Sequence, residues 1–133
     1  MRPYMTETPI IALDFDGVIM SGIDFTDMNQ PPVEGAIDTI KELKAMGCEI
    51  ILWTSRVNKG MFEAIDYLKK YDIFDCFSGF NSEAPSTPFK QGRKIFAHYY
   101  VDDLNLEGFG GYKLLLETVK RDLKEYKESI NET

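Results

Sequence analysis

The sequence predicts an α/β fold, a three-layer Rossmann-like arrangement in which a mostly parallel sheet carries helices on both faces. Three observations favour this class. Apolar segments of strand length alternate with segments whose apolar residues recur at helical spacing. The first of them, residues 10–13, is apolar throughout, which is typical of a strand covered on both sides. Polar residues follow three of the predicted strands, as expected where a parallel sheet forms a binding edge.

The first strand is expected over residues 9–15, and a helix is expected between Pro31-Pro32 and Gly47. Proline suits the first turn of a helix, and glycine suits the position just after its end. The apolar residues between these signals recur at helical spacing and predict the buried side of the helix. They are Val33, Ala36, Ile37, Ile40, Leu43 and Met46.

A second strand is expected over residues 48–53 and a second helix over residues 58–70, with Ser55 or Asn58 as its cap. The inner stripe of this helix is predicted to be Met61, Phe62, Ile65 and Leu68. A short third strand is expected over residues 73–77. The polar residues 78–93, which contain two prolines, predict a loop.

The fourth strand is expected over residues 97–101, and after three glycines the last helix is expected over residues 112–130. His98, within this strand, is interpreted as a core or rim residue. The predicted inner stripe of the last helix is Tyr112, Leu115, Leu116, Val119, Leu123, Tyr126 and Ile130. Its glutamates and lysines are expected to form a solvated face.

The length of 133 residues fits a single domain over residues 1–133. Fifteen basic residues against 22 acidic ones give a net charge of −7, which argues against a nucleic-acid partner or a membrane surface as partner. The two cysteines, Cys48 and Cys76, match no metal-site spacing, and the first residues lack the apolar segment of a signal peptide. A reduced, cytoplasmic protein is therefore expected.

Two carboxylates follow the first strand directly, at Asp14 and Asp16. In an extended chain residues i and i+2 point to the same side, so both are expected to face one point beyond the strand. The fourth strand also ends in acids, Asp102 and Asp103. Right-handed crossovers bring these strand ends to one edge of the sheet. Carboxylates from two strand ends suit a hard cation, and Mg²⁺ is the expected cofactor.

The same edge is expected to receive a phosphoryl group. The Thr54 hydroxyl and the backbone N–H groups of Ser55 and Arg56 precede a helix, where anions bind well. Lys94 precedes the fourth strand and is expected to reach the edge. Asp14 is placed to attack phosphorus and form an aspartyl-phosphate. The Arg56 side chain stays open between a salt bridge and a substrate contact.

These residues resemble the motifs of the haloacid dehalogenase (HAD) superfamily of phosphotransferases. The run from Asp14 to Val18 resembles the first motif, and Leu52-Trp53-Thr54-Ser55 resembles the second. Lys94 resembles the third-motif lysine, and Val101-Asp102-Asp103 resembles the acidic fourth motif. Each motif alone is weak, but the four occur in order beside predicted strands over residues 9–107. The resemblance implies a HAD-like hydrolase, a phosphoric monoester hydrolase.

The resemblance also implies a role for each residue. Asp14 is the nucleophile and a metal ligand, and Asp16 is the general acid and base, whose main-chain carbonyl also binds metal. Thr54 and Lys94 hold the phosphate, and Lys94 offsets the charge of Asp14. Asp103 aligns best with the metal-binding acid, and the adjacent Asp102 stays open as the direct ligand.

Two features depart from the family pattern or narrow it. Lys94 lies only eight residues before Asp102, so Lys90 competes with it as the phosphate-site lysine. The gaps where other members insert a cap domain have room only for a short flap over residues 21–30 and for the loop over residues 78–93. A capless member is therefore expected, whose substrate is a phosphorylated small molecule or macromolecule. The sequence leaves that substrate and the oligomeric state open.

Three alternatives stay open. The first is a phosphatase for a polynucleotide end or a nucleotide, against which the net charge argues. The second is a non-catalytic phosphate- or partner-binding module that keeps the fold, which the complete set of acids disfavours. The third is a CheY-like phosphoacceptor, in which the phosphorylated aspartate lies on a later strand, whereas here the paired acids follow the first strand.

Overall fold

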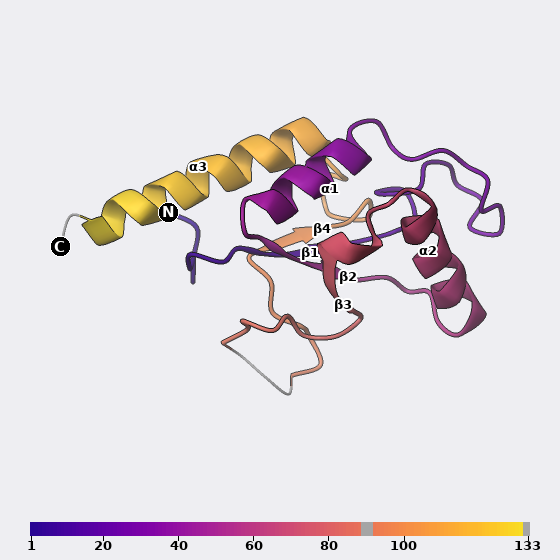
Figure 1. The fold of residues 1–133 in the computed structure, drawn as a ribbon, viewed down its shortest axis with the longest axis horizontal. Coiled ribbons are helices and arrows are strands. Elements are labelled where there is room, and N and C mark those ends of the chain that lie inside the picture. Colours follow the sequence, from indigo (N-terminus) through magenta and orange to yellow (C-terminus); the bar gives the residue numbers. More distant parts are fainter. Residues whose placement is uncertain (89–91, 132–133) are drawn as a thin grey trace.

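The computed structural model describes residues 1–88 and 92–131 and has an α/β architecture built on one all-parallel sheet (Figure 1). The predicted α/β class and parallel sheet are therefore confirmed. Neighbouring strands pair in register, with Leu13 opposite both Leu52 and Val101. The three strands that contain these residues thus end at one level. In sheet order the strands are β3 (Phe77–Phe80), β2 (Glu49–Leu52), β1 (Ile10–Leu13) and β4 (Tyr99–Val101).

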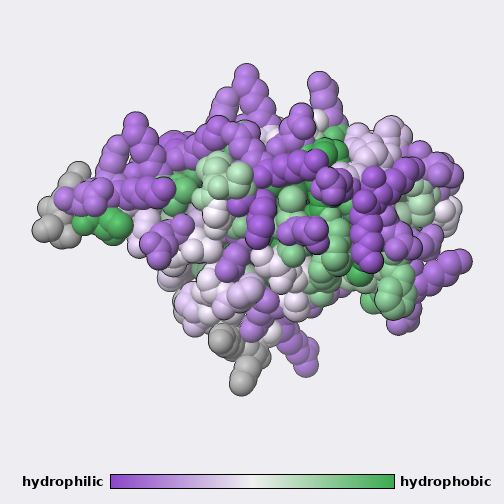
Figure 2. All heavy atoms as spheres, viewed as in Figure 1, coloured by the Kyte–Doolittle hydropathy of each residue, from purple (hydrophilic) through white to green (hydrophobic). Residues whose placement is uncertain are grey.

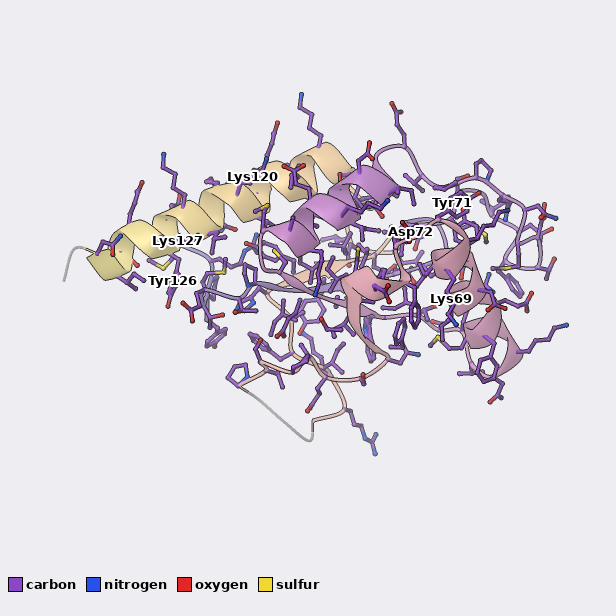
Figure 3. The ribbon with its side chains drawn as sticks, in the orientation of Figure 1. Lys69, Tyr71, Asp72, Lys120, Tyr126 and Lys127 are labelled. Carbon is purple, nitrogen blue, oxygen red and sulfur yellow. The ribbon has the colours of Figure 1, made fainter. Side chains whose placement is uncertain are left out.

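Three helices contribute to the core on one face of the sheet. They are α1 (Ala36–Ala45), α2 (Lys59–Lys70) and α3 (Tyr112–Asn131). Side chains from all three join one buried cluster with Leu13 and Leu52. The helices α1 and α3 lie side by side, and the Lys120 Nζ of α3 lies 2.8 Å from the Glu42 Oε1 of α1 (Figures 1 and 3).

The other face of the sheet is covered by the connection between β3 and β4 instead of a helix. Ala84, Ile95 and Ala97 from this connection form a second buried cluster with Ile10, Ala12 and Ile51. Figure 1 shows the connection on the side of the sheet opposite α1 and α3. For the described residues, the prediction of helices on both faces is therefore wrong. The connection contains Pro85 and Pro88, which disfavour a continuous helix.

The third strand lies later in the chain than predicted. Of the predicted residues 73–77 only Phe77 belongs to a strand, because Phe74–Cys76 is a short 3₁₀ helix, η1, and β3 begins at Phe77. β3 is an edge strand and is only partly buried, so it tolerates the polar and small residues Ser78 and Gly79. Their polarity caused the sequence interpretation to end the strand too early.

The first helix begins later than its prolines predict. Pro32 forms a β-bridge with Met20, and the Val33 N–H donates to the Ile19 carbonyl at 2.8 Å. These residues therefore fasten the loop after β1, and α1 starts only after Gly35, whose φ is 82°. The remaining strands and helices lie at the predicted places, with ends that differ by a few residues.

The buried side of α2 differs from the predicted stripe. Phe62 is 68% exposed, whereas Ala64 and Tyr67 are buried with Leu68. The Tyr67 ring packs edge-on against Phe15 at 5.2 Å, and its hydroxyl donates to the Gln30 carbonyl at 2.8 Å. Tyr67 therefore fixes α2 against Gln30 at the end of the flap and against Phe15 just after β1. The ring of Tyr71 packs against the ring of Tyr67 at 4.7 Å.

The buried side of α3 contains an acidic residue, Asp122, that the sequence did not indicate. Asp122 is 3% exposed and accepts hydrogen bonds from Tyr99 Oη at 2.8 Å and Arg2 Nε at 3.1 Å. Together these contacts hold the N-terminal segment against α3 and β4. Further along α3, Ile130 is 49% exposed, so the predicted apolar stripe does not stay buried to its end.

The surface over α3 and α1 is strongly polar, as predicted for the charged side chains of the last helix (Figure 2). No helix among the described residues is long and apolar enough to cross a membrane. Cys48 and Cys76 are both buried free thiols. His98 is buried as predicted: its Nδ1 accepts from the Ile10 N–H at 2.9 Å, and its Nε2 lies 2.8 Å from the Tyr4 carbonyl.

Candidate functional site

Three carboxylates meet where β1 and β4 end. Asp14 follows β1, Asp102 and Asp103 follow β4, and each offers an oxygen within 4.8 Å of the others. The Asp14 N–H donates to the Val101 carbonyl at 2.9 Å, so the backbone holds the two strand ends together. The structure thus brings both acids of the β4 end to Asp14. We call Asp14, Asp102 and Asp103 the acid cluster.

The acid cluster carries unfavourable charge. Burial, followed by the charges of Asp102, Asp103 and Asp16, raises the pKa of Asp14 to about 7, although the Phe15 N–H at 2.8 Å from Oδ1 acts to lower it. Loss of hydration, and then the neighbouring Asp102 carboxyl, raise the pKa of Asp103. A bound cation would relieve this repulsion. The donor set, three carboxylates at one point, fits a hard divalent ion such as Mg²⁺.

The raised pKa of Asp14 predicts how cation binding depends on pH. Protons and the cation compete for the same carboxylate, so affinity for Mg²⁺ is expected to fall about tenfold between pH 8 and pH 6. Without a cation, the contribution of Asp14 to folding stability changes with pH in the opposite direction. The folded state holds the Asp14 proton more tightly than the unfolded chain, so this group's contribution to stability is present below pH 3.8 and is lost as pH rises through about 7.

Calorimetric titration with MgCl₂ across this pH range checks the expectation. In Asp14→Asn the cation should bind more weakly, and its affinity should lose most of the pH dependence near 7. A wild-type affinity that stays constant from pH 6 to pH 8 would contradict the assignment of Asp14 as a ligand.

The Asp16 side chain does not point into the acid cluster, contrary to the expectation that Asp14 and Asp16 face one point. Its two oxygens accept from Arg56, at 2.7 Å from Nε and 2.8 Å from Nη2. The chain turns directly after β1, because the Phe15 carbonyl accepts from the N–H groups of residues 18–20. The backbone bends at Phe15, so the i, i+2 rule for strands does not apply across residues 14–16.

Arg56 connects three parts of the site. Besides its bidentate pair with Asp16, its Nη2 donates to the Phe25 carbonyl at 2.7 Å and its Nη1 to the Gly60 carbonyl at 3.4 Å. The side chain is only 8% exposed, and the guanidinium lies over the Phe15 ring at 5.1 Å. The structure thus gives the Arg56 side chain the salt-bridge role, and through it fastens the flap and α2 to Asp16.

Thr54 is held by a residue that the sequence interpretation missed. The Thr54 N–H donates to Asn81 Oδ1 at 2.8 Å, and Asn81 Nδ2 donates to the Thr54 carbonyl at 2.9 Å. Asn81 directly follows β3, so it is the polar residue at the end of a fourth strand. Placing β3 correctly at Phe77–Phe80 would have revealed Asn81. The same search for polar residues directly after a strand identified Asp14, Thr54 and Asp102.

The expected anion site at Thr54, Ser55 and Arg56 is only partly present. The Arg56 N–H donates to Thr54 Oγ1 at 3.1 Å and so already has a partner. Among the described residues no hydrogen bond uses the Ser55 N–H. The helix α2 begins only at Lys59, after Asn58 with φ of 50°. The turn itself therefore supplies the Thr54 hydroxyl and the Ser55 N–H, and the helix start lies further along the chain.

Lys94 is not brought to the acid cluster. It is exposed, and its Nζ lies over the Tyr100 ring at 4.7 Å, beside a hollow that Arg2 and Phe96 also line. The strongest charges that act on Asp14 are carboxylates. The position of Lys94 therefore gives no support to its expected role as phosphate ligand and partner of Asp14. The competing residue, Lys90, lies outside the described residues.

Gly17 allows Asp103 to approach the loop after β1. Its φ is +78°, and a Cβ at this position would collide with the Asp103 carboxylate. Gly47 provides a matched control, because its φ is +92° and a Cβ there would meet no atom within 4 Å. The two glycines share the backbone strain of a substitution, but only Gly17 contacts the acid cluster.

We expect Gly47→Ala to lower the free energy of unfolding by about 1 kcal/mol through backbone strain. Gly17→Ala should lower it by about 1–2 kcal/mol more, because overpacking displaces Asp103. It should also weaken Mg²⁺ binding, whereas Gly47→Ala should not. Urea denaturation and calorimetric titration measure both effects. Equal losses in the two variants, with unchanged cation affinity, would show that the contact of Gly17 with Asp103 is unimportant.

A pocket of about 790 Å³ opens beside the acid cluster. Asp16 and Asp103 line it, together with residues 22–26 of the flap except Asp24 and with residues 55–63 before and within α2 except Asn58, Met61 and Phe62. In Figure 1 the flap and α2 lie at the same end of the molecule, away from both termini. The pocket therefore lies where the carboxyl ends of the strands open to solvent, the usual ligand site of such sheets.

Fold and site together define an α/β protein with an all-parallel sheet and an acid cluster at its carboxyl edge. Among solved structures, the chain is similar to a conserved protein from Bacteroides thetaiotaomicron, with 26% identity and a TM-score of 0.75. The match covers 86% of this chain and 92% of that protein, whose description names no activity. No family model matches the chain, and no curated protein matches it.

Proposed function

We propose that this protein is a Mg²⁺-dependent phosphate monoester hydrolase, a capless HAD-like phosphatase that acts through an aspartyl-phosphate on Asp14. The observation that carries the proposal is the acid cluster, whose carboxylate oxygens lie within 4.8 Å of one another at the carboxyl edge of the sheet. The Thr54 turn and the Asp16–Arg56 pair border the same edge. Cation, phosphate and proton-transfer groups thus have candidates in one place.

Asp14, Asp102 and Asp103 would hold the cation, together with the main-chain carbonyl of Asp16 that the family resemblance implies. A bound Mg²⁺ supplies Lewis-acid polarisation of the phosphoryl oxygens and neutralises the carboxylates around Asp14. The Thr54 hydroxyl and the Ser55 N–H are the donors available to a phosphoryl oxygen. Asn81 keeps Thr54 in place through its two hydrogen bonds.

In the first step a carboxylate oxygen of Asp14 bonds to phosphorus while the ester P–O bond breaks. The departing oxygen takes a proton from Asp16. In the second step Asp16 takes a proton from water, the water oxygen bonds to phosphorus, and the bond to Asp14 breaks. Inorganic phosphate leaves, Asp14 is free again, and the proton remains on Asp16 for the next cycle.

The Asp16–Arg56 pair bears on both steps. Arg56 contacts both oxygens of Asp16 and so orients the carboxyl group that would transfer the proton. Proton delivery in the first step requires that at least one of the two contacts with Arg56 opens. Arg56 is therefore a positioning residue that sets where the acid and base group lies.

The direct test is hydrolysis of p-nitrophenyl phosphate with MgCl₂ and with EDTA. We expect turnover in MgCl₂ and a loss of at least about 100-fold in EDTA, since transition-state charge stabilisation by the metal would be removed. Equal rates in the two conditions would contradict a metal-dependent mechanism.

A second candidate is a phosphate-binding module without turnover. The observation in its favour is that both oxygens of Asp16 are occupied by Arg56 and that Lys94 lies away from the acid cluster. This candidate predicts that MgCl₂ binds, but that no ester in a broad phosphomonoester panel is hydrolysed.

A further inference from the structure

The pocket between the flap and α2 lies on the side of Asp16. Both Asp16 and Asp103 of the acid cluster line it. A proton donor must lie within hydrogen-bond distance of the oxygen that leaves. If Asp16 protonates the leaving oxygen, as the proposed function holds, the alcohol part of the ester extends from Asp16 into this pocket.

Three exposed apolar side chains line the pocket, beside the charged Lys59 and Glu63. Ile23 and Phe25 of the flap are 103% and 67% exposed, and Val57 opposite them is 67% exposed. Exposed apolar side chains that gather around one opening are typical of a binding site. An aromatic wall favours a ring-bearing ligand, because a ring can pack on Phe25 face-on or edge-on.

The flap is anchored at Phe25, the residue that supplies the aromatic wall. The Phe25 carbonyl accepts from Arg56 Nη2 at 2.7 Å, and Arg56 is in turn bound to both oxygens of Asp16. The same guanidinium therefore fixes the proton donor and the backbone of the aromatic wall. Because four of its five N–H groups already have partners, Arg56 has little capacity left to recognise a charged leaving group, and recognition falls mainly to the apolar side chains of the pocket.

We infer that the substrate is a small phosphate monoester whose alcohol part carries an apolar ring, with the ring held between Phe25, Ile23 and Val57. The inference rests on the proposed function and adds the substrate class to it. The volume of about 790 Å³ lies within the range of about 300–1,000 Å³ that small-molecule sites usually have.

The test compares benzyl phosphate with ethyl phosphate in MgCl₂. Both esters release an alcohol of similar basicity, so their chemistry differs little and their kcat/KM ratio reports contacts of the ring. We expect wild-type protein to prefer benzyl phosphate by at least about 30-fold, since a buried ring adds much apolar contact. Phe25→Ala should lower kcat/KM for benzyl phosphate about tenfold and for ethyl phosphate about twofold.

Phe62→Ala is the matched control, because Phe62 is equally exposed at 68% and lies on α2, but does not line the pocket. Phe62→Ala should leave kcat/KM unchanged for both benzyl phosphate and ethyl phosphate. Ile23→Ser is a second wall variant and should act in the same direction as Phe25→Ala. Turnover of both esters without preference, or an equal effect of Phe25→Ala and Phe62→Ala, would overturn the substrate class alone. Absence of turnover for both esters and for p-nitrophenyl phosphate would overturn the proposed function instead.

Discussion

Replacing Asp14 with asparagine is expected to slow Mg²⁺-dependent hydrolysis of p-nitrophenyl phosphate by about 10³-fold or more, because an amide cannot serve as the nucleophile. The same change removes one charge from the acid cluster. In EDTA at pH 8 it should therefore raise the free energy of unfolding, by about 1–2 kcal/mol, through relief of the repulsion between carboxylates. Activity and stability without metal are thus expected to change in opposite directions, as is common for functional acids.

Asp72→Asn is the control for this prediction. Asp72 is 95% exposed at the end of α2, and its φ of 59° suits asparagine as well as aspartate (Figure 3). This variant should keep both its activity and its stability. Rates in MgCl₂ and urea denaturation in EDTA measure the two effects. Undiminished activity in Asp14→Asn would exclude Asp14 as nucleophile, and unchanged stability would show that the acid cluster is not under electrostatic strain.

Replacing Asp16 with asparagine is expected to lower kcat by about 10²- to 10⁴-fold, the usual contribution of a general acid or base. The loss should depend on the leaving group. Ethoxide is strongly basic and needs a proton as it leaves, whereas p-nitrophenolate leaves without one. Ethyl phosphate should therefore lose activity in both steps, and p-nitrophenyl phosphate mainly in hydrolysis of the aspartyl-phosphate.

This dependence separates catalysis from structure. If Asp16 serves only to hold Arg56, then Asp16→Asn should affect both esters equally, and Arg56→Ala should reproduce its effect. If Asp16 transfers the proton, Arg56→Ala retains the carboxylate, and its loss should differ less between the two esters. Steady-state and single-turnover rates for the two substrates decide between these outcomes.

The sequence predicted the parts of the fold that depend on apolar patterning and on strong end signals. β1, β2 and α3 lie where their apolar residues place them, and the polar residues after β1 and β4 meet as parallel pairing requires. β3 was misplaced because an edge strand tolerates polar residues, and this error concealed Asn81. The covering of the second sheet face by a loop depends on distant packing, which local patterning does not report.

The sequence predicted which residues surround the site better than what their side chains contact. Asp14, Asp102 and Asp103 form the acid cluster, but the tight turn after β1 directs Asp16 to Arg56. Such a turn follows from backbone hydrogen bonds that no residue pattern announces. The position of Lys94 on Tyr100 likewise depends on how the connection after β3 packs, and the motif spacing alone placed it too close to Asp14.

The central claim is that Asp14 forms a covalent bond to phosphorus. Asp16→Asn should slow hydrolysis of that intermediate, and p-nitrophenyl phosphate should still form it, so the intermediate should accumulate during turnover. Borohydride reduces an acyl phosphate to an alcohol, which converts the modified aspartate into homoserine. Mass spectrometry of the treated protein should find homoserine at position 14 after incubation with substrate and MgCl₂, and none with EDTA. Unmodified Asp14, or homoserine at Asp102 or Asp103 instead, would contradict the mechanism.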